Sequence, residues 1–274
     1  MFSDYEVEDH AGGAVGGPLS TVASPNIRQV KTVLIEGVGW NDERVKTQPI
    51  GSGVMVDERT VLTAAHVVAG PSGYVDPYNV RVCTLGNRYS GGECQPIESL
   101  TAPGGVSDGT TGNDYAVIRL QAPWSRSVGW MAMSAASDSV LESTTHYHDG
   151  YAIWSSACTL NWTNASADLA QSGWYIGFNR THTSFERHAY FGVWLSTAHG
   201  QVKAVQPEEI NFNISSGSGM SGGPYYYCPA GCTDTAGAHF ATAITSSHNL
   251  GGPEDMATNG AKVSSFRSWV IANM

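Results

Sequence analysis

Lysine is scarce in this chain, and charged residues are few overall. Lysine occurs four times among 274 residues, charged residues make up 14% of the sequence, and the formal net charge is −10. Negative charge repels phosphate backbones, so we expect no nucleic-acid partner. No apolar run approaches the length of a membrane span, so we expect no membrane partner either. The length and the 41% hydrophobic content allow a substantial buried core.

Cysteine is also sparse, and five cysteines cannot all pair within one chain. Sequence alone does not settle their connectivity. The favoured pairs are Cys83 with Cys94, around a hairpin, and Cys228 with Cys232, around a tight loop, which leaves Cys158 single. Zinc binding by these four is the alternative, but the two pairs lack a matching spacing. Disulfides form in oxidising compartments and therefore indicate a secreted protein.

Extended helical patterns are nearly absent. The 32 glycines indicate many turns, and short β-branched or alternating segments follow one another from about residue 30 to 263. The end of the chain differs, because Phe266, Trp269 and Val270 lie at helical spacing. We expect an all-β fold with a short C-terminal helix over residues 264–274.

Residues 1–28 are rich in Gly, Pro and acidic residues, and we expect an N-terminal arm there. A signal peptide has a basic segment followed by an apolar one, and residues 1–28 lack this pattern. We therefore expect the sequence to be a mature form with an added Met1. Periodicity is lost over residues 122–145, which marks the linker between two halves. We place the first half at residues 29–125 and the second at residues 126–263.

Three segments combine a reactive side chain with a special backbone context. His66 ends the apolar segment Thr60-Val-Leu-Thr-Ala-Ala-His, and Asp114 precedes the buried strand pattern Tyr-Ala-Val-Ile-Arg-Leu. Ser221 lies within Gly219-Met-Ser-Gly-Gly-Pro224, where glycines allow a turn that aims two backbone N–H groups at one point. Together they offer a nucleophile, a base, an orienting carboxylate and donors for an oxyanion.

The order His, Asp, Ser with these flanks resembles the chymotrypsin-like (trypsin-like) serine peptidases, from about residue 30 to the C-terminus. The resemblance implies that His66 is the general base, Asp114 its orienting carboxylate and Ser221 the nucleophile. It also implies that the N–H groups of Gly219 and Ser221 form the oxyanion hole, and that the Ser246 hydroxyl supports Asp114.

The family resemblance further implies two six-stranded antiparallel Greek-key β-barrels, the first carrying His66 and Asp114 and the second Ser221. It implies a secreted, monomeric endopeptidase that acts on proteins or peptides through an acyl-enzyme, with no cofactor and no metal. The segment Asn259-Gly-Ala261 before the C-terminal helix is similar to that of the bacterial glutamyl endopeptidases and their relatives. We expect a relative of the secreted virulence peptidases of plant-pathogenic actinobacteria.

Two departures from the family bear on activation and specificity. Met220 stands where animal digestive members carry an aspartate that pairs with a new N-terminus. The resemblance places small, hydroxylic residues around the specificity pocket, and His248 is the one basic side chain among them. An uncharged pocket favours uncharged residues before the scissile bond, although His248 could reverse this. The expected pocket residues are Ser215, Ser216, Thr245, Ser247, His248 and Thr258.

Other interpretations stay open at this point. A protease-fold protein that only binds or acts as an effector would keep the same motifs. Gly219-x-Ser221-x-Gly223 also fits the nucleophile elbow of an α/β-hydrolase esterase, with Asp234 and His239 or His248 as partners. His146-x-His148 puts two imidazoles on one strand face and suggests a metal, but no third ligand is evident, which favours packing or solvent-facing histidines.

Overall fold

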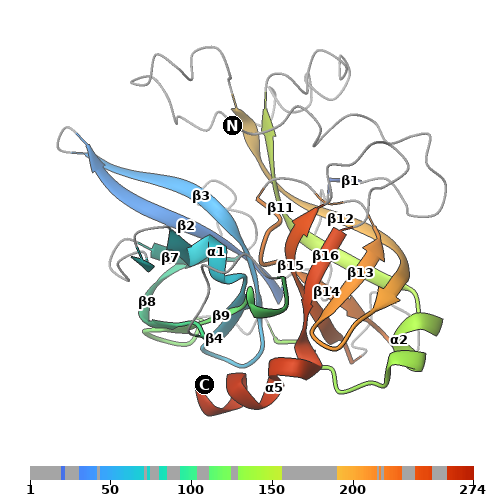
Figure 1. The fold of residues 1–274 in the computed structure, drawn as a ribbon. Helices are drawn as coiled ribbons and strands as arrows, with labels where there is room; N and C mark the ends of the chain where they lie inside the picture. The colour runs from blue at the N-terminus through green and yellow to red at the C-terminus, as the bar shows by residue number, and fades with distance from the viewer. Residues whose placement is uncertain are drawn as a thin grey trace.

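Strands make up most of the structure and fall into two groups (Figure 1). The computed structural model describes residues 20–21, 31–41, 44–70, 73–74, 80–84, 93–103, 111–124, 129–155, 190–214, 216, 219–229, 238–248 and 258–274. Within these residues no helix is both long enough and apolar enough to cross a membrane.

The first group of strands closes into an antiparallel six-stranded barrel. Around the ring the strands are β2 (Thr32–Asn41), β3 (Arg44–Met55), β4 (Thr60–Thr63), β9 (Ala116–Leu120), β8 (Cys94–Thr101) and β7 (Val80–Cys83). All four residues of β4 are buried. Both faces of β4 are therefore covered, which explains why its sequence does not alternate between apolar and charged residues.

The second group forms another six-stranded ring, with all six of its pairings antiparallel. Its strands in ring order are β11 (His146–Ser155), β12 (Tyr190–Val205), β13 (Glu209–Asn213), β16 (Thr258–Lys262), β15 (Phe240–His248) and β14 (Pro224–Tyr227). Two short strands are added outside the ring: β1 (Ser20–Thr21) pairs with β12, and β10 (Ala132–Met133) pairs in parallel with β15. Thus two residues of the expected N-terminal arm join the second barrel.

Both barrels have the same strand order. If the six strands of each ring are counted along the chain, their spatial order is 4-1-2-3-6-5 in both cases. The run 4-1-2-3 is the Greek key. The expected fold of two six-stranded Greek-key barrels is therefore confirmed, and the α/β-hydrolase alternative is wrong because that fold requires strands alternating with long helices.

Shorter elements complete the described structure. They are the helices α1 (Ala65–Val68) and α2 (Asp138–Ser143), a 3₁₀ turn over Thr111–Asn113, and the small hairpin of β5 (Ala69–Gly70) and β6 (Gly73–Tyr74). The chain crosses between the barrels near β10. There the Met131 N–H donates to the Met55 carbonyl of β3, and the Ala132 N–H donates to the His239 carbonyl beside β15.

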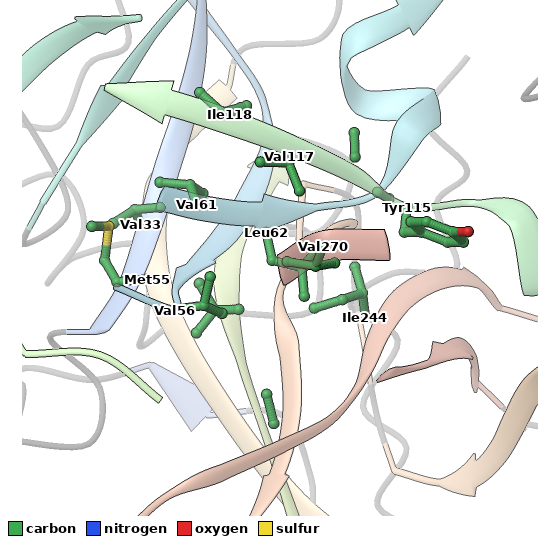
Figure 2. Close-up of a cluster of buried hydrophobic side chains, with 14 of the residues drawn as sticks. Val33, Met55, Val56, Val61, Leu62, Tyr115, Val117, Ile118, Ile244 and Val270 are labelled. Atoms are coloured by element: carbon green, nitrogen blue, oxygen red, sulfur yellow. The ribbon is translucent and has the colours of Figure 1, made fainter. Parts of the chain in front are cut away.

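One hydrophobic cluster joins the two barrels and the C-terminal helix α5 (Val263–Ala272). Val61, Leu62 and Val117 of the first barrel belong to it together with Ile244 of the second and Val270 of the helix (Figure 2). The expected C-terminal helix is confirmed, with its start one residue earlier than the spacing indicated. Tyr115, the residue after Asp114, packs against α5. The helix therefore stabilises the segment that carries Asp114.

The aromatic part of this contact is close-packed. The Tyr115 ring stacks on Phe266 with 3.9 Å between ring centroids, and it meets Trp269 edge-on at 5.2 Å. Aromatic pairs in such geometry contribute about 0.5–1.5 kcal/mol beyond their buried area.

The expected disulfide between Cys83 and Cys94 is present and joins residues directly opposite each other in β7 and β8. This pairing overturns the zinc alternative, because bonded sulfurs are not thiolate ligands. Cys228 is also disulfide-bonded. Its expected partner Cys232 and the unassigned Cys158 lie outside the described residues.

His146 and His148 are both fully buried, so of the two arrangements left open, packing and solvent-facing, the structure has them packed. The His146 ring packs near Phe212 and Tyr227, and its Nδ1 lies 2.9 Å from the Thr144 carbonyl oxygen. Burial lowers the pKa of His146 to about 4, although the hydrogen bond to Thr144 opposes this. The fold therefore holds a neutral imidazole in the core of the second barrel.

This buried histidine predicts loss of stability in mild acid. The folded-state pKa is about 4, below the unfolded value of roughly 6.5. Between these values the unfolded chain binds more protons, so the free energy of unfolding falls as the pH falls. For His146 the full loss is about 3 kcal/mol. Denaturant unfolding of His146→Phe from pH 7.5 to 4 should show a shallower decline than the unchanged protein.

The control for this measurement is His199→Gln, which changes an exposed histidine on the neighbouring strand β12. It should leave the pH dependence of unfolding unaltered. An equal decline in all three proteins would show that the acid sensitivity arises elsewhere.

Candidate active site

His66 and Asp114 come from two paired strands of the first barrel. His66 lies in α1, which begins at Ala65, and the single residue Ala64 separates it from the end of β4 at Thr63. Asp114 follows the 3₁₀ turn and precedes β9. Because Thr63 is paired with Ala116, the segments leaving β4 and entering β9 emerge at the same edge of the barrel. Neighbouring strands thus bring together two residues that are 48 positions apart.

The Asp114 carboxylate holds His66 at two points. Its Oδ2 lies 2.6 Å from His66 Nδ1, and its Oδ1 accepts the His66 backbone N–H at 2.9 Å. A carboxylate can only accept here, so the hydrogen of the neutral ring is on Nδ1 and the lone pair is on Nε2. The His66 side chain is 44% exposed and that of Asp114 12%, so the ring can meet a substrate while its partner stays shielded.

The second barrel also reaches Asp114. The Ser246 hydroxyl of β15 donates to Asp114 Oδ2 at 2.5 Å. Burial raises the pKa of Asp114, but hydrogen bonding and charge attraction from His66 outweigh it, helped by Ser246, so the pKa lies below its ordinary value. The carboxyl is therefore ionised at neutral pH, and it stabilises one tautomer and any positive charge on the imidazole.

Ser221 lies on a tight turn before β14. Gly219 and Gly222 have positive φ angles of 83° and 82°, which residues with a Cβ rarely adopt. Both barrels hold the turn: the Ser52 N–H of β3 donates to the Ser221 carbonyl at 2.8 Å, and the Gly222 N–H donates to the Thr245 carbonyl of β15 at 2.8 Å. The Ser52 hydroxyl donates to the Gly219 carbonyl at 2.6 Å.

Gly51 explains how α1 and the serine turn can come close. A Cβ on Gly51 would lie 2.6 Å from a Val67 methyl and 3.0 Å from the Ser221 carbonyl oxygen. The residue after His66 and the backbone of Ser221 thus pack on the same glycine. No hydrogen bond joins the Ser221 hydroxyl to the His66 ring, although both residues are described.

Two backbone donors at this turn are unused. Within the described residues the N–H groups of Gly219 and Ser221 make no hydrogen bond, whereas those of Gly222 and Gly223 donate to Thr245 and Met220. Free N–H groups beside a serine hydroxyl can donate hydrogen bonds to an oxygen on which negative charge develops. Met220, between them, is fully buried, and Gly150 makes room for it, since a Cβ there would lie 2.8 Å from the Met220 Cβ.

The expected pocket residues are only partly described. Thr245 and Thr258 are buried, and their hydroxyls donate to the carbonyls of Gly223 at 2.9 Å and Ile214 at 3.1 Å. Ser216 is half-buried. Ser215 lies outside the described residues, and so do the side chains of Ser247 and His248.

The sequence interpretation missed one residue of this region. The buried His148 ring lies 3.0 Å from the Ser216 hydroxyl through its Nε2. The only signal in the sequence was the alternation His146-x-His148, which indicates a shared strand face but not what that face contacts. Among the described residues no three potential metal ligands gather around this pair.

The double barrel and the placement of these side chains define the chymotrypsin-like class of folds. The family model described as Trypsin matches residues 39–270. The chain therefore belongs to the trypsin family, a family of serine endopeptidases.

A solved structure titled "Structure of Glu endopeptidase in complex with MPD" is similar over 95% of this chain and 97% of its own, with a TM-score of 0.61. Its sequence identity of 14% supports the shared fold alone. No curated protein sequence matches the chain.

The turn geometry predicts that Gly222→Ala will strongly reduce both stability and peptide hydrolysis. The added Cβ would lie 2.1 Å from Thr63 Oγ1 and 2.2 Å from the Ser52 carbonyl oxygen, besides the strain of the positive φ. Because a backbone atom cannot swing aside, the turn must move and carry Ser221 with it. We expect destabilisation beyond the ~1–2 kcal/mol of a left-handed residue, with loss of peptide hydrolysis.

Gly129→Ala is the matched control, since Gly129 has a similar φ of 69° but its Cβ would approach only the Lys31 side chain, at 3.4 Å. It should cost about 1–2 kcal/mol in denaturant unfolding and leave hydrolysis intact. Equal effects of the two alanines would mean that φ strain, and not the close approach, governs the turn.

Proposed function

We propose that the chain is a secreted endopeptidase whose catalytic residues are His66, Asp114 and Ser221, and that it cleaves peptide bonds through an acyl-enzyme. The observation that carries this proposal is the hydrogen-bonded arrangement around Asp114. It orients one tautomer of an exposed imidazole, and the next residue, Val67, packs on Gly51 together with the backbone of Ser221. A non-catalytic binding protein would not need this orientation.

In the first half of the reaction, Ser221 Oγ attacks the carbonyl carbon of the substrate. His66 Nε2 takes the hydroxyl proton, and the ionised Asp114 stabilises the imidazolium that forms. The carbonyl electron pair moves onto its oxygen, which accepts hydrogen bonds from the N–H groups of Gly219 and Ser221. When the tetrahedral intermediate collapses, the C–N bond breaks, and His66 returns the proton to the leaving amine.

In the second half, a water molecule attacks the ester carbon and gives its proton to His66 Nε2. The same backbone donors stabilise the second oxyanion. The C–O bond to Ser221 then breaks, the carboxylic product leaves, and His66 restores the serine hydroxyl. Ser246 contacts no reacting atom and acts by holding the Asp114 carboxylate.

For specificity we propose uncharged residues before the scissile bond. The described side chains of the expected pocket, Ser216, Thr245 and Thr258, are hydroxylic and uncharged. Burying an unpaired Lys, Arg or Glu side chain against them would cost several kcal/mol. His248 is the residue that could change this preference by pairing with a carboxylate.

The proposed setting is extracellular, with the enzyme acting as a monomer on proteins or peptides and needing no cofactor. The Cys83–Cys94 disulfide supports secretion, because such bonds persist in oxidising compartments.

The triad assignment predicts large losses on substitution. Ser221→Ala or His66→Ala should lower kcat by roughly 10⁶, and Asp114→Asn by roughly 10⁴, since the asparagine amide selects the wrong imidazole tautomer. The measurement is hydrolysis of a diverse peptide mixture, followed by mass spectrometry. Circular dichroism should show that each variant keeps its fold.

Ser264→Ala is the control, because Ser264 is an exposed serine on α5. It should retain full activity and full labelling by a fluorophosphonate, which Ser221→Ala should abolish. Substantial hydrolysis by His66→Ala would show that the proposed base is the wrong residue.

A further inference from the structure

A polar cluster lies behind Ser216 in the second barrel. The His148 ring of β11 is fully buried and stacks on Tyr225 of β14 with 4.3 Å between ring centroids. Its Nε2 lies 3.0 Å from Ser216 Oγ, and its Nδ1 lies 3.2 Å from the Pro224 carbonyl oxygen. Each buried donor and acceptor in such a cluster needs a hydrogen-bond partner, so the direction of one hydrogen bond decides the direction of the next.

The direction of these hydrogen bonds follows from the carbonyl. The Pro224 oxygen can only accept, so His148 Nδ1 carries the hydrogen and Nε2 of the neutral ring accepts. The Ser216 hydroxyl must then donate to Nε2, and only the lone pairs of Ser216 Oγ remain for a substrate.

Two neighbouring threonine hydroxyls are also left as hydrogen-bond acceptors. Thr245 and Thr258 donate their hydrogens to backbone carbonyls, so they too are left with lone pairs. The other ionisable groups nearby are neutral: burial raises the pKa of Tyr225, although hydrogen bonding with Thr258, Thr245 and Ser216 opposes this, and His146 has a pKa lowered to about 4. The neutral Tyr225 hydroxyl keeps its hydrogen and can donate it to a lone pair of one of these three hydroxyls, whose own hydrogens are already used. Asp149 follows His148 but lies on the opposite face of β11, where it accepts the Tyr226 hydroxyl at 2.7 Å.

We propose that His148 is a positioning residue that turns Ser216 into a hydrogen-bond acceptor, and that the enzyme therefore selects carboxamide side chains, Gln and Asn, before the scissile bond. This inference rests on the proposed function, which places Ser216 in the pocket. A carboxamide NH₂ donates to Ser216 Oγ. The carboxylate of Glu has the same shape but can only accept, so it faces an acceptor and loses its solvation.

The size of the selectivity follows from this mismatch. Sites built to hydrogen-bond a substrate group reject an analogue lacking it by up to 10⁴–10⁵. Because Ser216 is only half-buried, we expect a smaller factor of about 10² for Gln over Glu in kcat/KM, and about 10 for Gln over the apolar Met.

The test uses the full chain at pH 7.5 and peptides that differ only in Gln, Glu or Met before the scissile bond. His148→Phe keeps a ring on Tyr225 but removes the acceptor, so the Ser216 hydrogen becomes free to face the pocket. The Gln-to-Glu ratio should fall about 10-fold or more, while kcat/KM for Met stays nearly unchanged. Ser216→Ala should abolish the preference for Gln over Met and covers the case in which His148→Phe does not fold.

His199→Phe is the matched control, because it changes an exposed histidine on the adjacent strand and should leave all three rates unaltered. Equal cleavage after Glu and Gln by the unchanged enzyme would overturn the inference, as would an equal loss for all three peptides in His148→Phe. Absence of both peptide cleavage and fluorophosphonate labelling would instead overturn the proposed function, and this inference with it.

Discussion

The Asp114 carboxylate is the point on which the site depends. It accepts the ring and backbone N–H groups of His66 from the first barrel and the Ser246 hydroxyl from the second. Three donors outweigh the cost of burying the charge, which is why the pKa is lowered although burial alone would raise it. A single ion thus fixes an imidazole tautomer and ties the two barrels together at the site.

Close backbone approach is the second constraint. Gly51 and Gly222 lie where the serine turn meets the first barrel, and neither position leaves room for a Cβ. Hydrogen bonds from Ser52 and to Thr245 then hold the turn from both sides. Among the described residues, the N–H groups of Gly219 and Ser221 make no hydrogen bond. The turn that carries Ser221 is therefore supported by both barrels.

The second barrel has an unusually polar interior beside the site. His146 and His148 are alternate residues of β11 that share one face of the strand, and both are fully buried. Their surroundings include the stacked rings of Phe212 and Tyr225, 4.0 Å apart. Such groups are costly to bury without partners. In the pocket that we propose, the hydrogen bond between His148 and Ser216 would determine which atoms of Ser216 a substrate can reach.

The sequence by itself determined the local features of this protein. The strand patterns, the three reactive segments in order, the Cys83–Cys94 pair and the C-terminal helix could all be inferred from periodicity, turn residues and the family resemblance. Only the tertiary structure decided which distant residues meet. The repeated strand order of the two barrels left no visible sequence repeat, and His148 contacts Ser216 across 68 positions. Alternation along a strand shows which side chains share a face, but the ring order of the barrel decides what that face contacts.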